Sequence, residues 1–399
     1  MRYCVVFVFA FSLIRAADWP NWRGPNHDGI SLEKLPKADF SKIEWRVNIG
    51  VGFSTMAVAE GRVFALGSTG KRHGNKETFY CLNANTGKQI WSDTYPAELV
   101  DYLHEGGPCA SPTIDGQRVF GLSKSGRLVC YERATGKKFW TVDLMKKAEL
   151  PRPPEWGFAA SPFILGDLII VESTFTCALN KMTGKEVWRS RTYKPAYGSP
   201  ISFVFQDKPY LATLKTDGLV ILDVNTGKTV AFQDWRTSFR TNSTTPIVVG
   251  NKIFVSTGYR RGCALFEFSG KALRQIYANK DMSNHMNNSV VIGGYLYGFD
   301  GNTHQAGPKQ LVCMRWSDGK IQWRADGFRC GSLMAIQNNL LVLGETGNLA
   351  FGPASPKEFR PVTEAKILRG RCWTVPVYAN GRIYARNAAG DLVCVNVRN

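Results

Sequence analysis

The sequence predicts an all-β protein: an eight-bladed β-propeller of four-stranded antiparallel blades, closed by a strand near the N-terminus. Three observations lead to this prediction. A turn containing Gly-Lys returns six times at a nearly constant interval, an apolar hairpin precedes the turns, and the chain ends one strand short of a complete last blade. Self-similarity at such an interval is typical of architectures that repeat one supersecondary unit.

The recurring turn defines the repeat. Its glycines lie 43 to 49 residues apart, which is the length of a four-stranded blade. Asn-Thr-Gly and Ser-Asp-Gly sequences favour tight turns, because glycine accepts a positive φ. We expect the turn to join the third and fourth strands, and the tryptophan that often follows the lysine to pack against the neighbouring blade. The glycines are Gly87, Gly136, Gly184, Gly227, Gly270 and Gly319, and the tryptophans are Trp91, Trp140, Trp188 and Trp323.

The first two strands of each blade are predicted from the segments before these turns. SPTIDGQRVFGL and TPIVVGNKIFVS are examples, each with an apolar strand, a glycine turn and a second apolar strand. Alternation with a period of two and the density of turns exclude a helical repeat.

The blade count is eight. A seventh blade runs from Gly331 to about Leu368, and an eighth begins at Trp373 and stops after three strands. The segment 43–49, with Trp45 in the setting of the other tryptophans, supplies the missing strand. A ring closed in this way has no open sheet edge.

The cysteines are predicted to be core residues. A position six residues before each anchoring glycine holds Cys, Ala or Ile, which is typical of an inward-facing site. We interpret these cysteines as free buried thiols rather than disulfides, and leave Cys109, Cys330 and Cys372 open. The column is Cys81, Cys130, Ala178, Ile221, Ala264 and Cys313, with Cys394 at the analogous place in the eighth blade.

Residues 1–16 are predicted to be a signal peptide. Arg2 precedes a ten-residue apolar stretch, and the small Ala16 and Ala17 follow it. A buried N-terminal strand is the alternative. Residues 17–42 are then a leader segment and residues 43–399 the propeller. We expect an exported monomer, periplasmic or extracellular, and no stretch is long enough to span a membrane as a helix.

The formal net charge is +18. Such a charge favours acidic partners, although it also serves solubility. The basic residues are scattered, so no nucleic-acid partner is expected. The lysines after the anchoring glycines are either solvated turn residues or a peripheral basic ring.

The repeat resembles the pyrroloquinoline-quinone (PQQ) repeat, AxDxxTGKxxW, of quinoprotein dehydrogenases and of the assembly lipoprotein BamB, over about residues 43–399. The opening WPNWRGPNHDGIS, residues 19–31, looks like the leader of secreted members. The resemblance implies eight blades. In the dehydrogenases it also implies PQQ near the axis, a calcium ion held by Glu, Asn and Asp, a catalytic Asp, a stacking Trp and two adjacent cysteines. This chain has no Cys-Cys pair, lacks long inserted loops and has no lipobox.

The candidate binding site comes from the segments that lead into the innermost strands, which are polar, aromatic and small. HEGGPCASP and RGRCWTVP are examples. In a propeller these segments ring one mouth of the central channel. We interpret them as a funnel for a polar or anionic ligand, with Arg329 and Arg371 as clamps and His285 as the strongest single candidate. The alternative is an ordinary water-filled mouth. The predicted residues are His104, Glu105, Trp156, Tyr197, Arg240, Asn242, His285, Asn287, Asn288, Arg329, Arg371 and Trp373.

The leading hypothesis is a noncatalytic exported propeller that binds a protein partner or a polar or anionic ligand at the funnel mouth. One alternative is an alcohol or sugar dehydrogenase that depends on PQQ and calcium. The other is a protein that binds carbohydrate or polyanions. No catalytic or metal-ligating residue is assigned, since the sequence has no Gly-x-Ser-x-Gly elbow, Walker loop or HExxH motif.

Overall fold

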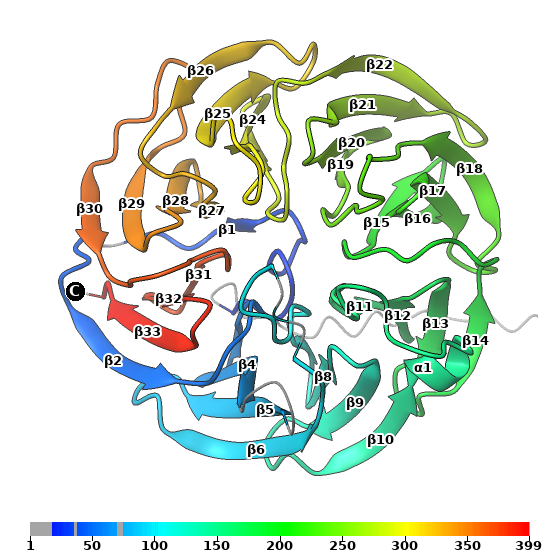
Figure 1. Cartoon of the computed structure of the whole chain (residues 1–399), viewed down its shortest axis with the longest axis horizontal. Helices are drawn as coiled ribbons and strands as arrows, with labels where there is room; N and C mark the ends of the chain where they lie inside the picture. Colours follow the sequence, from blue (N-terminus) through cyan, green and yellow to red (C-terminus); the bar gives the residue numbers. More distant parts are fainter. Residues whose placement is uncertain (1–17, 36–37, 70–74, 100, 102, 399) are drawn as a thin grey trace, which may run out of the picture.

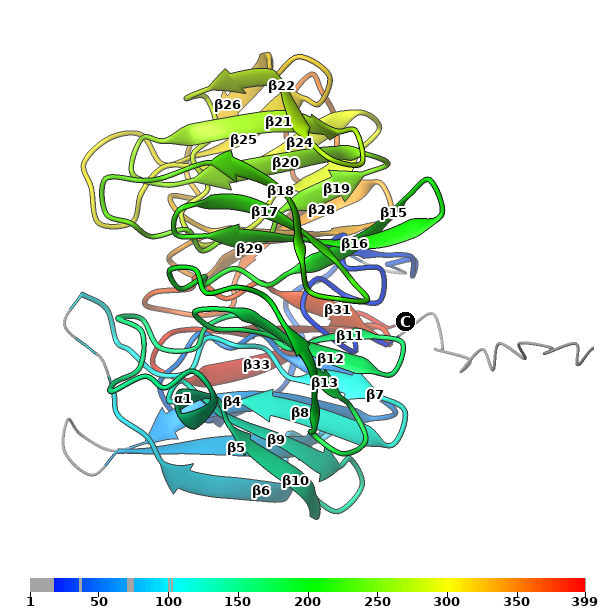
Figure 2. The same cartoon turned by 90° about the vertical axis from the view of Figure 1, so that its right-hand side faces the viewer.

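The computed structural model of the protein describes residues 18–35, 38–69, 75–99, 101 and 103–398. Eight β-sheets stand around one central axis, and the first strand of each blade lies nearest to that axis (Figure 1). Figure 2 shows the ring from the side, with the strands of neighbouring blades lying one above another. The predicted all-β, eight-bladed fold is confirmed. The predicted signal peptide lies outside the described residues.

The first four blades each hold four consecutive antiparallel strands. Blade 1 contains β3 (Ala57–Ala59), β4 (Arg62–Thr69), β5 (Lys76–Asn83) and β6 (Gln89–Pro96). Blade 2 contains β7 (Thr113–Asp115), β8 (Arg118–Leu122), β9 (Arg127–Glu132) and β10 (Lys138–Asp143). Blade 3 contains β11 (Phe163–Leu165), β12 (Leu168–Glu172), β13 (Thr176–Asn180) and β14 (Glu186–Arg189). Blade 4 contains β15 (Ile201–Phe205), β16 (Lys208–Lys215), β17 (Gly218–Asp223) and β18 (Thr229–Asp234).

The last four blades include two strands from the start of the chain. Blade 5 contains β19 (Ile247–Val249), β20 (Lys252–Thr257), β21 (Gly262–Phe268) and β22 (Leu273–Asn279). Blade 6 contains β23 (Val290–Ile292), β24 (Tyr295–Asp300), β25 (Gln310–Arg315) and β26 (Ile321–Ala325). Blade 7 contains β27 (Ser332–Ile336), β28 (Asn339–Leu343), β29 (Asn348–Pro353) and β30 (Thr363–Lys366), with β1 (Ile30–Ser31) added beside β27. Blade 8 contains β31 (Val377–Ala379), β32 (Arg382–Arg386), β33 (Asp391–Asn396) and β2 (Ile43–Asn48).

Burial follows position in the blade. The middle strands are buried on both faces, as in β17, because each sheet packs between two other sheets. The outermost strands alternate between exposed and covered side chains, as in β6. Among the described residues, the one α-helix is α1 (Leu144–Lys147), and no helix is long and apolar enough to cross a membrane.

The ring closes as the sequence predicts. β2 pairs antiparallel with β33, and Trp45 stands opposite Cys394. The first and last parts of the propeller therefore share one sheet. Both edges of the chain's last hairpin are covered, which removes an exposed edge open to pairing with another molecule.

The Gly-Lys turns and the tryptophans meet across the seams between blades. Each anchoring glycine has a positive φ, and four of the six lie against an indole of the preceding blade. Gly270 and Gly319 lie instead against the rings of Phe205 and Tyr277. A β-carbon on Gly136 would stand 2.6 Å from the ring of Trp91. The indole Nε1 of Trp91 donates to the carbonyl of Arg133 in the same turn, at 3.1 Å. Glycine is therefore needed both for the positive φ of the turn and for the close approach of the ring. The predicted packing of the tryptophans against the neighbouring blade is confirmed. The same contact joins Trp45 to Gly87, Trp140 to Gly184 and Trp188 to Gly227.

The cysteine column lies in the core, as predicted. All seven of its members are fully buried. The nine described cysteines are free, and Cys109 is the one that is not fully buried. Burial raises the pKa of the Cys81 thiol to about 12, so this side chain behaves as a small apolar residue.

Candidate functional site

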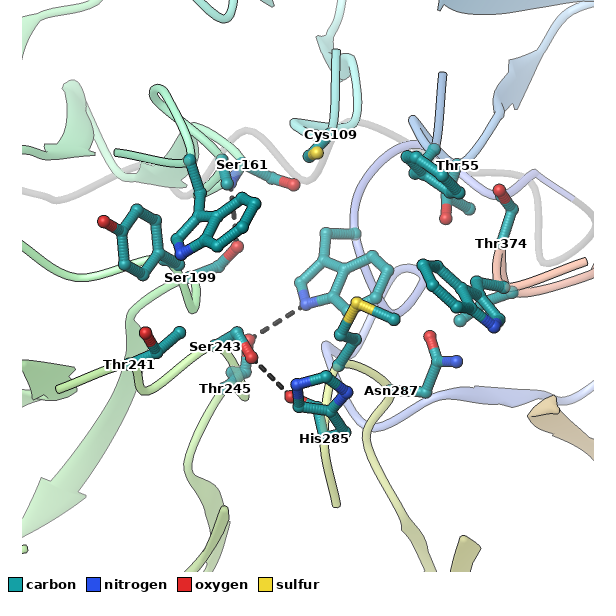
Figure 3. A pocket seen from close by; sticks show the side chains of 18 of the residues that line it. Thr55, Cys109, Ser161, Ser199, Thr241, Ser243, Thr245, His285, Asn287 and Thr374 are labelled. Carbon is teal, nitrogen blue, oxygen red and sulfur yellow. Dashed lines mark hydrogen bonds between the residues drawn. The ribbon is translucent and has the colours of Figure 1, made fainter. Parts of the chain in front are cut away.

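A pocket occupies the centre of the ring. Its volume is about 150 Å³, and side chains from seven blades and from the leader line it. The pocket lies where the segments preceding the innermost strands converge, at the mouth where the sequence predicts a funnel (Figure 3).

The leader closes the other side of this pocket. Trp19 forms two backbone hydrogen bonds with Val58, each 2.8 Å, and β1 pairs in parallel with β27. Between these attachments, Trp22 reaches the pocket and donates its Nε1 proton to Thr245 Oγ1 at 3.0 Å. The leader thus contacts blades 1, 5 and 7 and crosses the middle of the ring (Figure 1). The channel is therefore a blind pocket with an indole in its floor.

Aromatic rings form an unbroken series around the pocket wall, which we name the aromatic collar. Neighbouring ring centroids in the series are 4.9 to 5.7 Å apart. Rings of this kind present flat apolar faces and bury much surface against a ligand. The collar consists, in order, of Tyr259, His285, His304, Trp373, Phe53, His104 and Trp156.

Small hydroxyl residues stand at equivalent places in several blades. Thr55, Ser161, Ser199 and Thr245 each lie two residues before an innermost strand and line the pocket. The amide of Ser111 donates to Ser161 Oγ at 2.9 Å, and the amide of Ser161 donates to Ser199 Oγ at 2.8 Å. These hydroxyls therefore link successive blades. Their own hydrogens have no acceptor within the described part of the chain.

The collar histidines are uncharged at neutral pH. Burial, with a contribution from the nearby Lys124, lowers the pKa of His104 to about 4. Burial and the neighbouring His304 lower the pKa of His285 to about 3, and burial also lowers the pKa of His304. The Gly106 amide donates to His104 Nδ1 at 3.0 Å, so the neutral ring carries its proton on Nε2.

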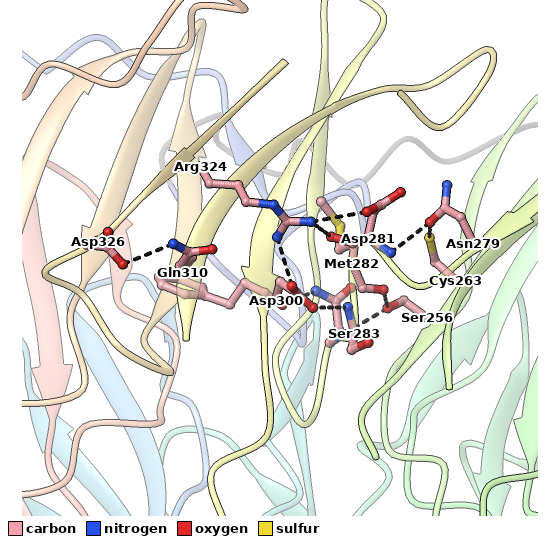
Figure 4. Close-up of polar contacts among 12 residues, drawn as sticks. Ser256, Cys263, Asn279, Asp281, Met282, Ser283, Asp300, Gln310, Arg324 and Asp326 are labelled. Carbon is pink, nitrogen blue, oxygen red and sulfur yellow. Dashed lines mark hydrogen bonds and ion pairs between the residues drawn. The ribbon is translucent and has the colours of Figure 1, made fainter. Parts of the chain in front are cut away.

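Hydrogen bonds fix the loop that carries His285 (Figure 4). Arg324 donates to Asp300 and to Asp281, and the Ser283 amide donates to Asp300 at 2.9 Å. Ser256 Oγ donates to the Met282 carbonyl at 2.8 Å. The loop is thus tied to blades 5 and 6 on both sides before it reaches the pocket.

Six of the twelve predicted residues line the pocket and six do not. Those in the wall are His104, Trp156, Tyr197, His285, Asn287 and Trp373. Two others, Asn242 and Asn288, are buried structural links. Asn242 Nδ2 donates to the Lys215 carbonyl at 2.8 Å, and the Thr245 amide donates to Asn288 Oδ1 at 3.1 Å. The amide side chains are thus occupied by backbone groups.

The four charged residues of the prediction lie outside the pocket. Arg371 pairs with Glu105 at 2.8 Å, and its guanidinium covers the ring of Trp373. Arg329 pairs with Glu345 at 3.0 Å. Arg240 is exposed. The two arginines interpreted as clamps for an anion are therefore already engaged by carboxylates of the protein itself.

Several lining residues escaped the prediction. Phe53 and Thr55 come from the segment leading into blade 1, from which the prediction took no residue. Counting eight blades requires eight such segments, and that signal could have found them. His304 and Tyr259 lie instead on loops between second and third strands, and Trp22 lies in the leader. No repeat marks these three positions.

The pocket does not fit PQQ with calcium. PQQ carries three carboxylates, and calcium requires several oxygen ligands that are usually carboxylates or carbonyls. Among the described residues that line the pocket, none is Asp, Glu, Lys or Arg, and Asn287 offers the one side-chain amide. No group of three or more His, Cys, Asp or Glu side chains in the described part of the chain is placed to hold a metal ion. The donor set is thus wrong for both the organic group and its metal.

Comparisons with known proteins agree with the fold. The family described as outer membrane protein assembly factor BamB matches residues 37–120 and 75–325. Outer membrane protein assembly factor BamB of Shewanella oneidensis is 23% identical over 348 residues, which are 81% of this chain and 78% of that protein.

Two solved structures show the same architecture. The crystal structure of BamB from Moraxella catarrhalis has a TM-score of 0.63 at 18% identity, covering 89% of this chain and 99% of that one. Quinohemoprotein alcohol dehydrogenase from Comamonas testosteroni has a TM-score of 0.67 at 14% identity, covering 96% of this chain and 80% of that one. These likenesses show the fold. Because the family match spans most of the propeller, the chain belongs to the family of outer membrane protein assembly factor BamB.

Proposed function

We propose that this chain is an exported, noncatalytic binding propeller that holds a ligand, or a side group of a partner, in the central pocket. The observation that carries the proposal is the lining of the pocket: aromatic rings and neutral hydroxyls on a blind cavity, with no charged side chain among the described lining residues. Pockets that are mostly apolar with a few convergent polar groups are typical of ligand sites.

The lining also favours binding over the dehydrogenase alternative. The pocket offers no carboxylate pair for acid–base chemistry. Burial raises the pKa of the Cys109 thiol, which keeps it protonated and weakly nucleophilic. A ligand bound here would be held by shape complementarity and hydrogen bonds, and it would not contact a reactive group.

A pocket-filling variant tests the proposal. Ala159 lines the pocket, so Ala159→Trp should block it, whereas Val249→Trp adds the same ring at an exposed position on blade 5. We expect a ligand-detected NMR screen of neutral sugars, uronic acids, aromatic amides and short peptides to give at least one binder that is lost only in Ala159→Trp. Binding that persists in Ala159→Trp contradicts the proposal, and so does dye-linked turnover after addition of PQQ and calcium.

A second candidate is a role with a protein partner in outer membrane assembly, which the family match supports. A photo-crosslinking residue at exposed Arg240, on the funnel side, should then capture a partner in the producing cell. The same residue at Val249, at the end of an innermost strand, is the matched control. Equal capture from both positions contradicts a funnel-side contact.

Export follows from the predicted signal peptide. Mass spectrometry of the secreted chain should give an N-terminus at Ala17. Retention of residues 1–16 on the mature protein contradicts this part of the proposal.

A further inference from the structure

The aromatic collar offers flat faces around a narrow space. The planes of His104 and Trp156 are inclined by 30°, and those of Phe53 and Trp373 by 27°. The volume of about 150 Å³ equals that of an engineered cavity that holds one benzene molecule. The pocket is therefore wide enough for one six-membered ring lying against an indole or phenyl face.

Polar groups without partners line the same space. Thr55 lines the pocket with a hydroxyl that makes no hydrogen bond among the described residues. The hydroxyl hydrogens of Ser161 and Ser199 have no acceptor among the described residues, since each hydroxyl is used only as an acceptor. The Nε2 proton of His104 also has no acceptor among the described residues. Both donors and acceptors thus remain open in the wall, and buried polar groups are normally satisfied.

The wall carries no charge at neutral pH. Its described residues include no Asp, Glu, Lys or Arg, and its histidines are neutral because burial lowers their pKa values. Lys124 lies behind the wall and does not line the pocket, and its buried Nζ has no hydrogen-bond partner within the described ranges of the chain. An ionised ligand would lose its hydration without gaining a counter-charge in contact with it.

We infer that the pocket takes the uncharged ring of a neutral sugar, such as the terminal residue of a neutral glycan. Aromatic faces suit the C–H face of a pyranose, and open hydroxyl, amide and imidazole groups suit its hydroxyls. An aromatic side chain of a partner protein would fill the same space but would leave these polar groups unsatisfied. The inference rests on the proposed binding function and specifies its ligand.

The first experiment compares the binding of a neutral sugar with that of a charged sugar whose ring has the same shape. We expect the folded protein to bind neutral glycans on an array, and to bind the methyl glycoside of the best one in calorimetry at pH 7.5. The uronic acid with the same ring should bind at least about tenfold more weakly, because one carboxylate is added to a site without a counter-charge.

Variants then locate the sugar. Trp156→Ala should weaken binding about tenfold through loss of stacking, and Trp156→Phe should restore most of it. Thr55→Val should weaken binding about fivefold, because it removes one hydrogen-bonding group without changing the shape of the wall. Phe232→Ala removes an exposed ring from β18, far from the pocket wall, and should leave affinity unchanged.

The outcomes separate this inference from the function on which it rests. Failure of the folded protein to bind any neutral glycan, or tighter binding of the uronic acid, overturns the sugar assignment. If N-acetyl-tryptophanamide binds and is lost in Ala159→Trp while sugars do not bind, the ligand is an aromatic side chain. In that case the binding function stands and only the sugar assignment falls.

Discussion

The seams between blades and the central pocket differ in how they use aromatic residues. At four of the seams, one indole meets one glycine turn, and the same contact returns from blade to blade. In the pocket, seven rings come from unlike positions and form one continuous collar. Repetition stabilises the ring because every blade must bury the same kind of face. The pocket is built once, so its residues are free to differ from blade to blade.

The largest expected effect concerns a seam glycine. Gly136→Ala should lower the free energy of unfolding by about 3 kcal/mol, since a β-carbon would both strain a φ of 77° and press on Trp91. Gly116→Ala is the matched control, with a φ of 54° and nothing within 4 Å of the new carbon. It should cost about 1 kcal/mol. Urea unfolding measures both, and equal losses would show that strain alone acts at the seam.

The next effect is a loss of stability at acidic pH, caused by a histidine of the pocket. Because the pKa of His285 falls to about 3 on folding from an ordinary value of 6.5, the unfolded chain binds more protons between these values. Stability should therefore decrease as the pH falls through this window, by about 2 kcal/mol for this group between pH 7.5 and 5. His285→Asn keeps an acceptor for Thr303 and should flatten that slope. An unchanged slope in urea titrations would place the titrating groups elsewhere.

A smaller effect on stability distinguishes a seam whose indole donates a hydrogen bond from a seam whose indole does not. Trp45 Nε1 donates to the Ala84 carbonyl at 3.0 Å, whereas the buried Nε1 of Trp188 has no acceptor in the part of the chain that the structure describes. Trp45→Phe should therefore cost about 1 kcal/mol more than Trp188→Phe. Both variants lose the same indole volume, so thermal and urea unfolding isolate the hydrogen bond. Equal costs would mean that the indole contributes by packing alone.

The smallest effect on stability is expected in the pocket. Thr374→Val removes a hydroxyl that has no hydrogen-bond partner among the described residues, and should change the free energy of unfolding by less than about 0.5 kcal/mol. Thr244→Val removes a hydroxyl that donates to the Ser256 carbonyl at 2.6 Å, and should cost about 1 kcal/mol. A large loss in Thr374→Val would assign that hydroxyl a structural role.

Much of the fold could be predicted because the local chemistry is repeated. Gly136 and its counterparts mark turns that only a few residue types accept, and the spacing of the turns fixed four strands to a blade. Trp45 revealed the closing strand because it stood in the same setting as the other tryptophans. The cysteine column was found in the same way, because the same place in each repeat holds Cys, Ala or Ile and no polar residue.

The site was predicted only in part, because position near the channel does not decide where a side chain points. Asn242 and Asn287 lie in similar segments, yet the buried amide of Asn242 bonds to backbone carbonyls and to the Thr257 hydroxyl, whereas Asn287 lines the pocket. Arg371 and Glu105 are 266 residues apart and pair only because the closed ring brings together the segments that lead into blades 8 and 2. No local pattern contains that contact.

The sequence by itself determined the class of fold, the number of blades and the closure of the ring, because turn chemistry and apolar periodicity act over a few residues. The tertiary structure decided the pocket. It brought Trp22 from the leader into the floor and set His304 and Tyr259 in the wall, and it paired the charged residues with one another outside the cavity. These outcomes depend on distances across the closed ring, and the identity of a residue does not encode such distances.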